Sequence, residues 1–147
     1  MEVSTWFIVI FVLMWLAGPL TQVLFLIAPK LHHKIGLTEA DALKPEFKWF
    51  LLDERAIAYA DLTYFLSGIT FVVLVLQDDR SALVFGLYSC ACYVYVASLA
   101  IPRWLLLGKH GISPLPAKQL PVYFSYMIMF MLFGLYGLYY LWGLTQP

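Results

Sequence analysis

Residues 53–61 read DERAIAYAD and open an apolar run that continues to Leu76. The other apolar runs carry no charge, whereas Asp61 lies inside this one, about 7–8 Å beyond its start at Ala56. A charge in hydrocarbon costs roughly 2.5–3.5 kcal/mol on insertion scales, so Asp61 needs a partner, a proton or water. Asp61 is therefore the first candidate functional residue.

The composition predicts the class of protein. The 147 residues are 63% hydrophobic and only 12% charged, whereas soluble domains use roughly 45–50% apolar residues. The charges cluster between apolar runs of about 20 residues, the length that crosses a bilayer core. We expect a single domain over residues 1–147, an all-α integral membrane protein. Its net charge of zero gives no reason to expect nucleic acid as a partner.

The apolar runs predict four transmembrane helices in an antiparallel bundle, at about 6–28, 56–76, 82–101 and 121–142. Eight of the nine lysines and arginines fall in the two loops 29–55 and 102–120. The positive-inside rule then predicts that both loops are cytoplasmic and both termini lie outside. We also expect a short interfacial helical segment between the first and second helices.

Prolines and glycines predict local features of the helices. Gly18-Pro19 should kink the first span, because proline removes a hydrogen bond of the helix. Proline suits the first helical turn, so a helix should begin at Pro45 and run to Leu76, and the last span should begin at Pro121. Gly86 and Cys90, four residues apart, favour a close helix contact in the third span.

The depth of Asp61 in the membrane indicates which residues on the other spans could be its partners. Counting inward by the same distance from the cytoplasmic edge of the other spans reaches Gln22 on the first, Ser98 on the third, and Ser125 or Tyr126 on the fourth. We therefore predict a polar layer of Gln22, Asp61, Ser98 and Tyr126. Such a layer either only orients the helices or forms a proton or substrate site.

The charges before Asp61 are expected at the cytoplasmic interface. At 100° per residue, Glu54, Asp61 and Gly68 share one stripe of their helix, whereas Arg55 lies about 120° away. Arg55 therefore does not neutralise Asp61 along the same helix. We place Glu54 and Arg55 at the interface, on turns that overshoot the membrane.

Motifs for cofactor, metal or catalytic chemistry are not found. His32, His33 and His110 lie in loops, whereas haem held between helices needs an axial ligand within a span. The Glu-x-x-His pattern of di-iron bundles is missing, as are phosphate loops and nucleophile elbows. We therefore expect no cofactor and no metal, and we assign no catalytic residue.

In length and four-span layout the chain resembles small bacterial membrane proteins of the DoxX-like kind. The likeness is one of architecture, so no residue role follows from it. It agrees with a location in a bacterial inner (plasma) membrane.

Three functions are compatible with these features. The generic polar residues favour a non-catalytic accessory, assembly or interaction role, with other membrane subunits or further copies of this chain as partners. The alternative is a small proton-linked carrier, a channel or a protein that binds a lipid or small hydrophobic ligand through Asp61. The third is a membrane enzyme acting on a lipid-like substrate, which would need a cavity near Asp61, Glu54 and Arg55.

Overall fold

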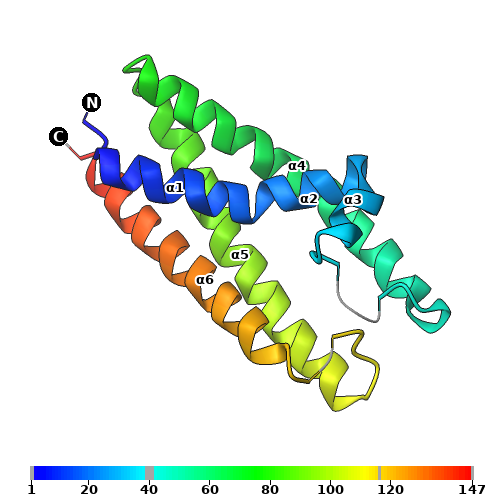
Figure 1. The fold of residues 1–147 in the computed structure, drawn as a ribbon. Helices are drawn as coiled ribbons and strands as arrows, with labels where there is room; N and C mark the ends of the chain where they lie inside the picture. Colours follow the sequence, from blue (N-terminus) through cyan, green and yellow to red (C-terminus); the bar gives the residue numbers. More distant parts are fainter. Residues whose placement is uncertain (1, 39–41, 116, 147) are drawn as a thin grey trace.

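The chain folds into a bundle of long helices, shown in Figure 1 as a computed structural model. The structure describes residues 2–38, 42–115 and 117–146. Within them the elements are α1 (Thr5–Ala17), α2 (Pro19–Ile27), α3 (Pro29–Lys34), η1 (Pro45–Phe47), α4 (Lys48–Leu76), α5 (Ala82–Lys109) and α6 (Leu120–Gly143).

Four helical stretches are long and apolar enough to cross a membrane: Thr5–Ile27, Pro45–Leu76, Ala82–Lys109 and Leu120–Gly143. The short helix α3 lies between the first two of them. The predicted all-α class, with four spans and a short helical segment after the first, is confirmed.

The first span is broken at Gly18. Helix α1 ends at Ala17 and α2 begins with Pro19 in its first turn, where its missing N–H is not needed. A Cβ on Gly18 would stand 2.6 Å from the ring of Phe130 on α6. The break therefore lies where α6 approaches the chain closely, and the predicted kink is confirmed.

The longest helices, α4 and α5, form an antiparallel hairpin. Gln77 closes α4, Asp78 adopts a left-handed conformation with φ of 54°, and the Asp79 carboxylate accepts hydrogen bonds from Ser81. Helix α5 contains Pro102 and continues to Lys109, beyond the predicted end of the span at 101. Both helices therefore extend past the apolar segments toward the loops.

Helix packing follows the order α2, α4, α5, α6 around the bundle. In the part of the chain that the structure describes, α2 and α6 do not pack closely against each other. Glycines bring the neighbouring helices close, because a Cβ on Gly134 of α6 would stand 2.7 Å from the carbonyl oxygen of Cys90 on α5. A Cβ on Gly86 would meet Phe71 and Leu141, so the close contact predicted at Gly86 and Cys90 is confirmed.

The two ends of the bundle are filled differently. Both termini lie at one end of the bundle (Figure 1). There an aromatic core fills the space between the helices, and its buried members include Phe7, Phe11, Phe71, Tyr93 and Phe133. At the loop end, a smaller cluster around Phe50 and Trp104 packs between α4 and α5. Large apolar side chains also cover the outside, such as Leu66, Val84 and Leu132, as expected of helices that face lipid.

Candidate functional site

A cavity of about 560 Å³ lies in the loop half of the bundle. Its wall is built from α2, α3, the residues after α3, α4, α5 and α6. Tyr95 and Val122 line it although they are 65% and 69% exposed, so they form its rim and the cavity is not sealed. The volume lies within the range of about 300–1,000 Å³ that is typical of small-molecule sites.

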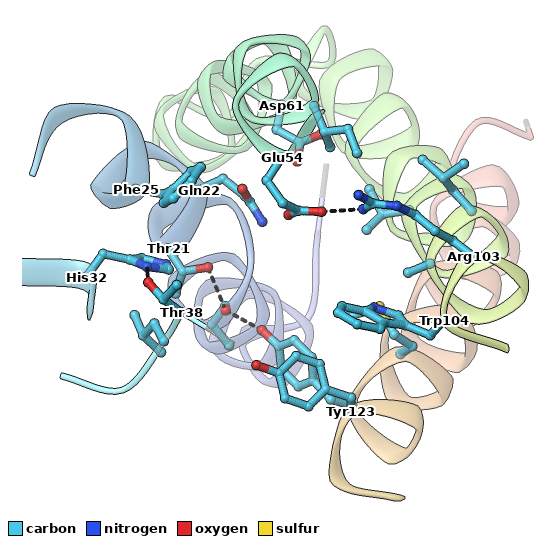
Figure 2. A pocket seen from close by; sticks show the side chains of 18 of the residues that line it. Thr21, Gln22, Phe25, His32, Thr38, Glu54, Asp61, Arg103, Trp104 and Tyr123 are labelled. Carbon is cyan, nitrogen blue, oxygen red and sulfur yellow. Dashed lines mark hydrogen bonds and ion pairs between the residues drawn. The ribbon is translucent and has the colours of Figure 1, made fainter. Parts of the chain in front are cut away.

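The α4 wall carries two acids. Glu54 and Asp61 are seven residues apart, which places them on one face of the helix two turns apart. Figure 2 shows both side chains beside the cavity, with Gln22 pointing into the same space from α2. The predicted stripe thus faces the first span, where Gly68 leaves room for Trp15.

Arg103 on α5 supplies the positive charge. Its Nη1 binds the Glu54 carboxylate, and its Nη2 lies 2.5 Å from Oδ2 of Asp53. The guanidinium carbon lies 4.8 Å from the centroid of the Phe50 ring, a cation–π contact. Both ends of the guanidinium and one of its faces are therefore already engaged.

Asp61 differs from Glu54 in its partners. In residues 2–38, 42–115 and 117–146, no hydrogen bond or ion pair joins Asp61 to another residue. The side chain is neither fully buried nor exposed, and it faces the cavity. Among the described residues this carboxyl group has no partner, and it faces the cavity.

Tyr126 joins α6 to the break in the first span. Its hydroxyl donates a hydrogen bond to the carbonyl oxygen of Ala17, the last residue of α1. The hydroxyl of Thr21 donates to the carbonyl oxygen of Gly18 at 2.6 Å. The Tyr126 bond satisfies a carbonyl at the end of α1 where the helix is interrupted, and it links α1 to α6 beside the cavity.

Helix α3 and the following residues close the cavity on a further side. His32 and Thr38 are buried and form a 2.9 Å hydrogen bond between Nδ1 and Oγ1, with the Phe25 ring beside the imidazole (Figure 2). Burial lowers the pKa of His32 below its ordinary value, and the neighbouring His33 lowers this pKa further. His32 is therefore neutral at pH 7.

The structure brings together three members of the predicted polar layer. Gln22, Asp61 and Tyr126 all line the cavity. Ser98 is exposed on the other side of α5 and does not line it. Depth fixes the height of a residue on its helix, but it does not fix the direction in which the side chain points.

The two predicted interface charges are separated. Glu54 lines the cavity and binds Arg103, whereas Arg55 is exposed and borders a small hollow of about 90 Å³ beside His33. The cation on the described cavity wall is therefore Arg103, which the sequence placed only in the predicted loop 102–120.

The missed ion pair has a signal in the sequence. In an antiparallel helical hairpin that turns near Asp79, residues at similar distances before and after the turn lie level with each other, because both helices rise equally per residue. Glu54 and Arg103 lie 25 and 24 positions from Asp79 and form the ion pair. Ser67 and Ser89 lie 12 and 10 positions from it, and their hydroxyls form a 2.7 Å hydrogen bond.

The site is chemically suited to binding. Among the described lining residues there is no serine, cysteine or lysine, and the hydroxyls of Thr21 and Thr38 are already hydrogen-bonded. Across the described ranges, no three His, Cys, Asp or Glu side chains gather in a way that could hold a metal ion.

Comparison with known proteins identifies no relative of this chain. No protein-family model, no curated protein and no solved structure matches the chain.

Proposed function

We propose that this chain is a membrane protein that binds a small amphipathic molecule in the cavity, without catalysing a reaction. The observation that carries the proposal is an unpartnered carboxylate, Asp61, on the wall of a cavity of about 560 Å³. A free acid in an apolar bundle is costly unless something meets it. A ligand with a polar head and an apolar body would meet Asp61 and the apolar walls together.

The accessory or assembly role in a complex or homo-oligomer, which the sequence favours, stays a prediction. Polar residues that only specify helix packing would be expected to bind one another, as Ser67 and Ser89 do in the middle of the bundle. Asp61 and Gln22 instead face open space. This difference favours a ligand-binding role over a purely structural one.

The enzyme alternative also gains a cavity beside Asp61 and Glu54. An activated nucleophile needs a hydroxyl, thiol, amine or carboxylate next to a base. Among the described lining residues the Thr38 hydroxyl lies beside the His32 imidazole, but each of these residues is only 8% exposed. The Thr21 hydroxyl is bonded to the Gly18 carbonyl, and Glu54 is held by Arg103. The lining therefore supports binding better than group transfer.

We infer that the cavity half of the bundle faces the cytoplasm. Most basic residues lie at the loop end, which the positive-inside rule assigns to the cytoplasmic side of a bacterial inner membrane. Both termini lie at the opposite end (Figure 1). A C-terminal alkaline phosphatase fusion should be active and a C-terminal fluorescent protein dark; the reverse pattern would contradict this orientation.

Binding is tested by titrating 1-octanol, a neutral amphiphile, into ¹⁵N-labelled protein in phosphatidylcholine nanodiscs. The indole N–H signal of Trp104, on the cavity wall and 6% exposed, should shift and saturate. Trp142, 63% exposed and outside the cavity, serves as the internal control. Equal, non-saturating shifts of both indoles would show partition into lipid and contradict the proposal.

A pair of cavity variants sharpens the test. Ala100 lines the cavity, so Ala100→Phe should fill part of it and weaken octanol binding. Ala91 lies exposed on the same helix, so Ala91→Phe adds the same bulk outside the cavity and should leave binding unchanged. Equal binding by both variants would place the octanol site elsewhere.

A further inference from the structure

The described part of the cavity wall carries more acidic than basic side chains. Glu54 and Asp61 are acids, Arg103 is the cation, and Asp53 adds a second acid to Arg103 from just outside the lining. His32 is neutral at pH 7 because burial lowers its pKa. The described lining therefore holds two carboxylates against one guanidinium, and Asp53 shares that guanidinium from an exposed position. In a site partly shielded from water, such an imbalance produces a negative potential.

Arg103 is not available to an anion. Its two terminal nitrogens bind Glu54 and Asp53, and its face lies on the Phe50 ring. An anionic ligand would have to displace a carboxylate from this arrangement. The charge left free to act on a ligand is Asp61.

We propose, building on the binding role above, that the ligand is an organic cation, with an ammonium or amidinium group on an apolar body. The cationic group would lie between Asp61 and Glu54 on the α4 wall. Gln22, whose side chain points into the same space (Figure 2), would direct its amide oxygen toward the cationic group.

The rest of the lining suits the same class of ligand. Aromatic side chains attract cations over their faces, and Tyr95, Trp104, Tyr123 and Tyr126 line the cavity. The remaining wall is largely aliphatic and would hold an apolar body, through Leu51, Ile57, Val96, Leu99 and Met127. The described lining contains no lysine, and its one arginine, Arg103, is already bound to two carboxylates.

The test compares three amphiphiles with one tail and different heads: octyltrimethylammonium, octanol and octyl sulfate. Each is titrated below its micelle concentration into the protein in phosphatidylcholine nanodiscs, with empty nanodiscs subtracted, and the Trp104 indole signal reports binding. Octyltrimethylammonium should bind roughly tenfold or more tightly than octanol, and octyl sulfate more weakly than octanol. Asp61→Asn should reduce the preference for octyltrimethylammonium over octanol to about twofold or less.

The matched control is Asp79→Asn. It removes one negative charge at the opposite end of α4, on an exposed turn outside the cavity, and should keep the full preference. Octanol binding with no preference for the cation would overturn the ligand class and leave the binding role intact. A preference that survives Asp61→Asn would overturn the assignment of Asp61 as the residue that recognises the cation. No saturable shift of Trp104 with any of the three compounds would overturn both.

Discussion

The Arg103 guanidinium on α5 binds the Glu54 carboxylate on α4 beside the cavity, although 49 positions separate them in the chain. Both side chains are largely buried, with 18% and 17% of their surface exposed. Asp53 binds the same guanidinium, but 52% of its side chain is exposed. The hairpin is thus held at its loop end by one ion pair shielded from water and one open to it.

This asymmetry predicts unequal costs for removing the two acids. Glu54→Gln should lower the free energy of unfolding by roughly 1–3 kcal/mol, because it weakens a charge-assisted hydrogen bond in a partly buried place. Asp53→Asn should cost less than about 1 kcal/mol, since exposed ion pairs contribute little. Reversible unfolding in mixed micelles measures both, and equal costs would contradict the assignment.

Tyr126 and Ser98 form a second matched pair. Tyr126→Phe should destabilise the protein by about 1 kcal/mol, because it removes the only donated hydroxyl from α6 to the Ala17 carbonyl among the described residues. Ser98→Ala should change the stability by less than about 0.5 kcal/mol, since Ser98 is exposed on α5. A larger cost for Ser98→Ala would show that the predicted four-residue layer acts as a unit.

The helices themselves were predictable, because apolar length and proline position are local properties of a sequence. The four spans, the break at Gly18 and the helix starts near Pro45 and Pro121 all follow from backbone chemistry. The position at which α5 ends depends on contacts with residues that are distant in the sequence. The third span was predicted to end at 101, but the helix continues to Lys109, because packing of Trp104 on Phe50 and Tyr123 stabilises the extra turns.

The sequence predicted how deep the site residues lie in the membrane, but it did not predict the direction in which each side chain points. Counting residues from the membrane edge placed Gln22, Asp61 and Tyr126 level with one another, and all three line the cavity. The rotation of α5 places Arg103 on the cavity wall and turns Ser98 away from it. That rotation depends on which face packs against α4 and α6, through contacts such as Cys90 against Gly137. A single sequence does not reveal which faces of the helices pack together.

The close approach of α5 and α6 gives a prediction about glycines. A Cβ on Gly134 would stand 2.7 Å from a backbone oxygen, so Gly134→Ala must push the helices apart and should cost roughly 1–3 kcal/mol. Gly108 has no atom within 4 Å of its Cβ position, so Gly108→Ala should stabilise α5 by about 0.5–1 kcal/mol. Unfolding experiments should therefore give opposite signs. A neutral Gly134→Ala would mean that the two helices pack less tightly than described.

Helix α3 is held against the cavity by a titratable residue. His32 is buried and bonded to Thr38, and burial lowers its pKa below the ordinary value of about 6.5. In the undocked segment the imidazole is solvated and regains its ordinary pKa. Between the lowered and the ordinary pKa, the undocked form therefore binds more protons, so the docked form loses stability as the pH falls.

Docking of residues 29–38 should consequently be complete above about pH 6.5 and weaken as the pH falls below that value. Hydrogen exchange of the backbone amides in this segment, corrected for the intrinsic effect of pH, should show less protection at pH 5 than at pH 7.5. His32→Gln should remove this pH dependence, because the glutamine side chain does not titrate. His33→Gln should keep it, since His33 is exposed and does not bond to Thr38. Protection that is equal at both pH values in the unmodified chain would show that His32 does not control the docking of α3.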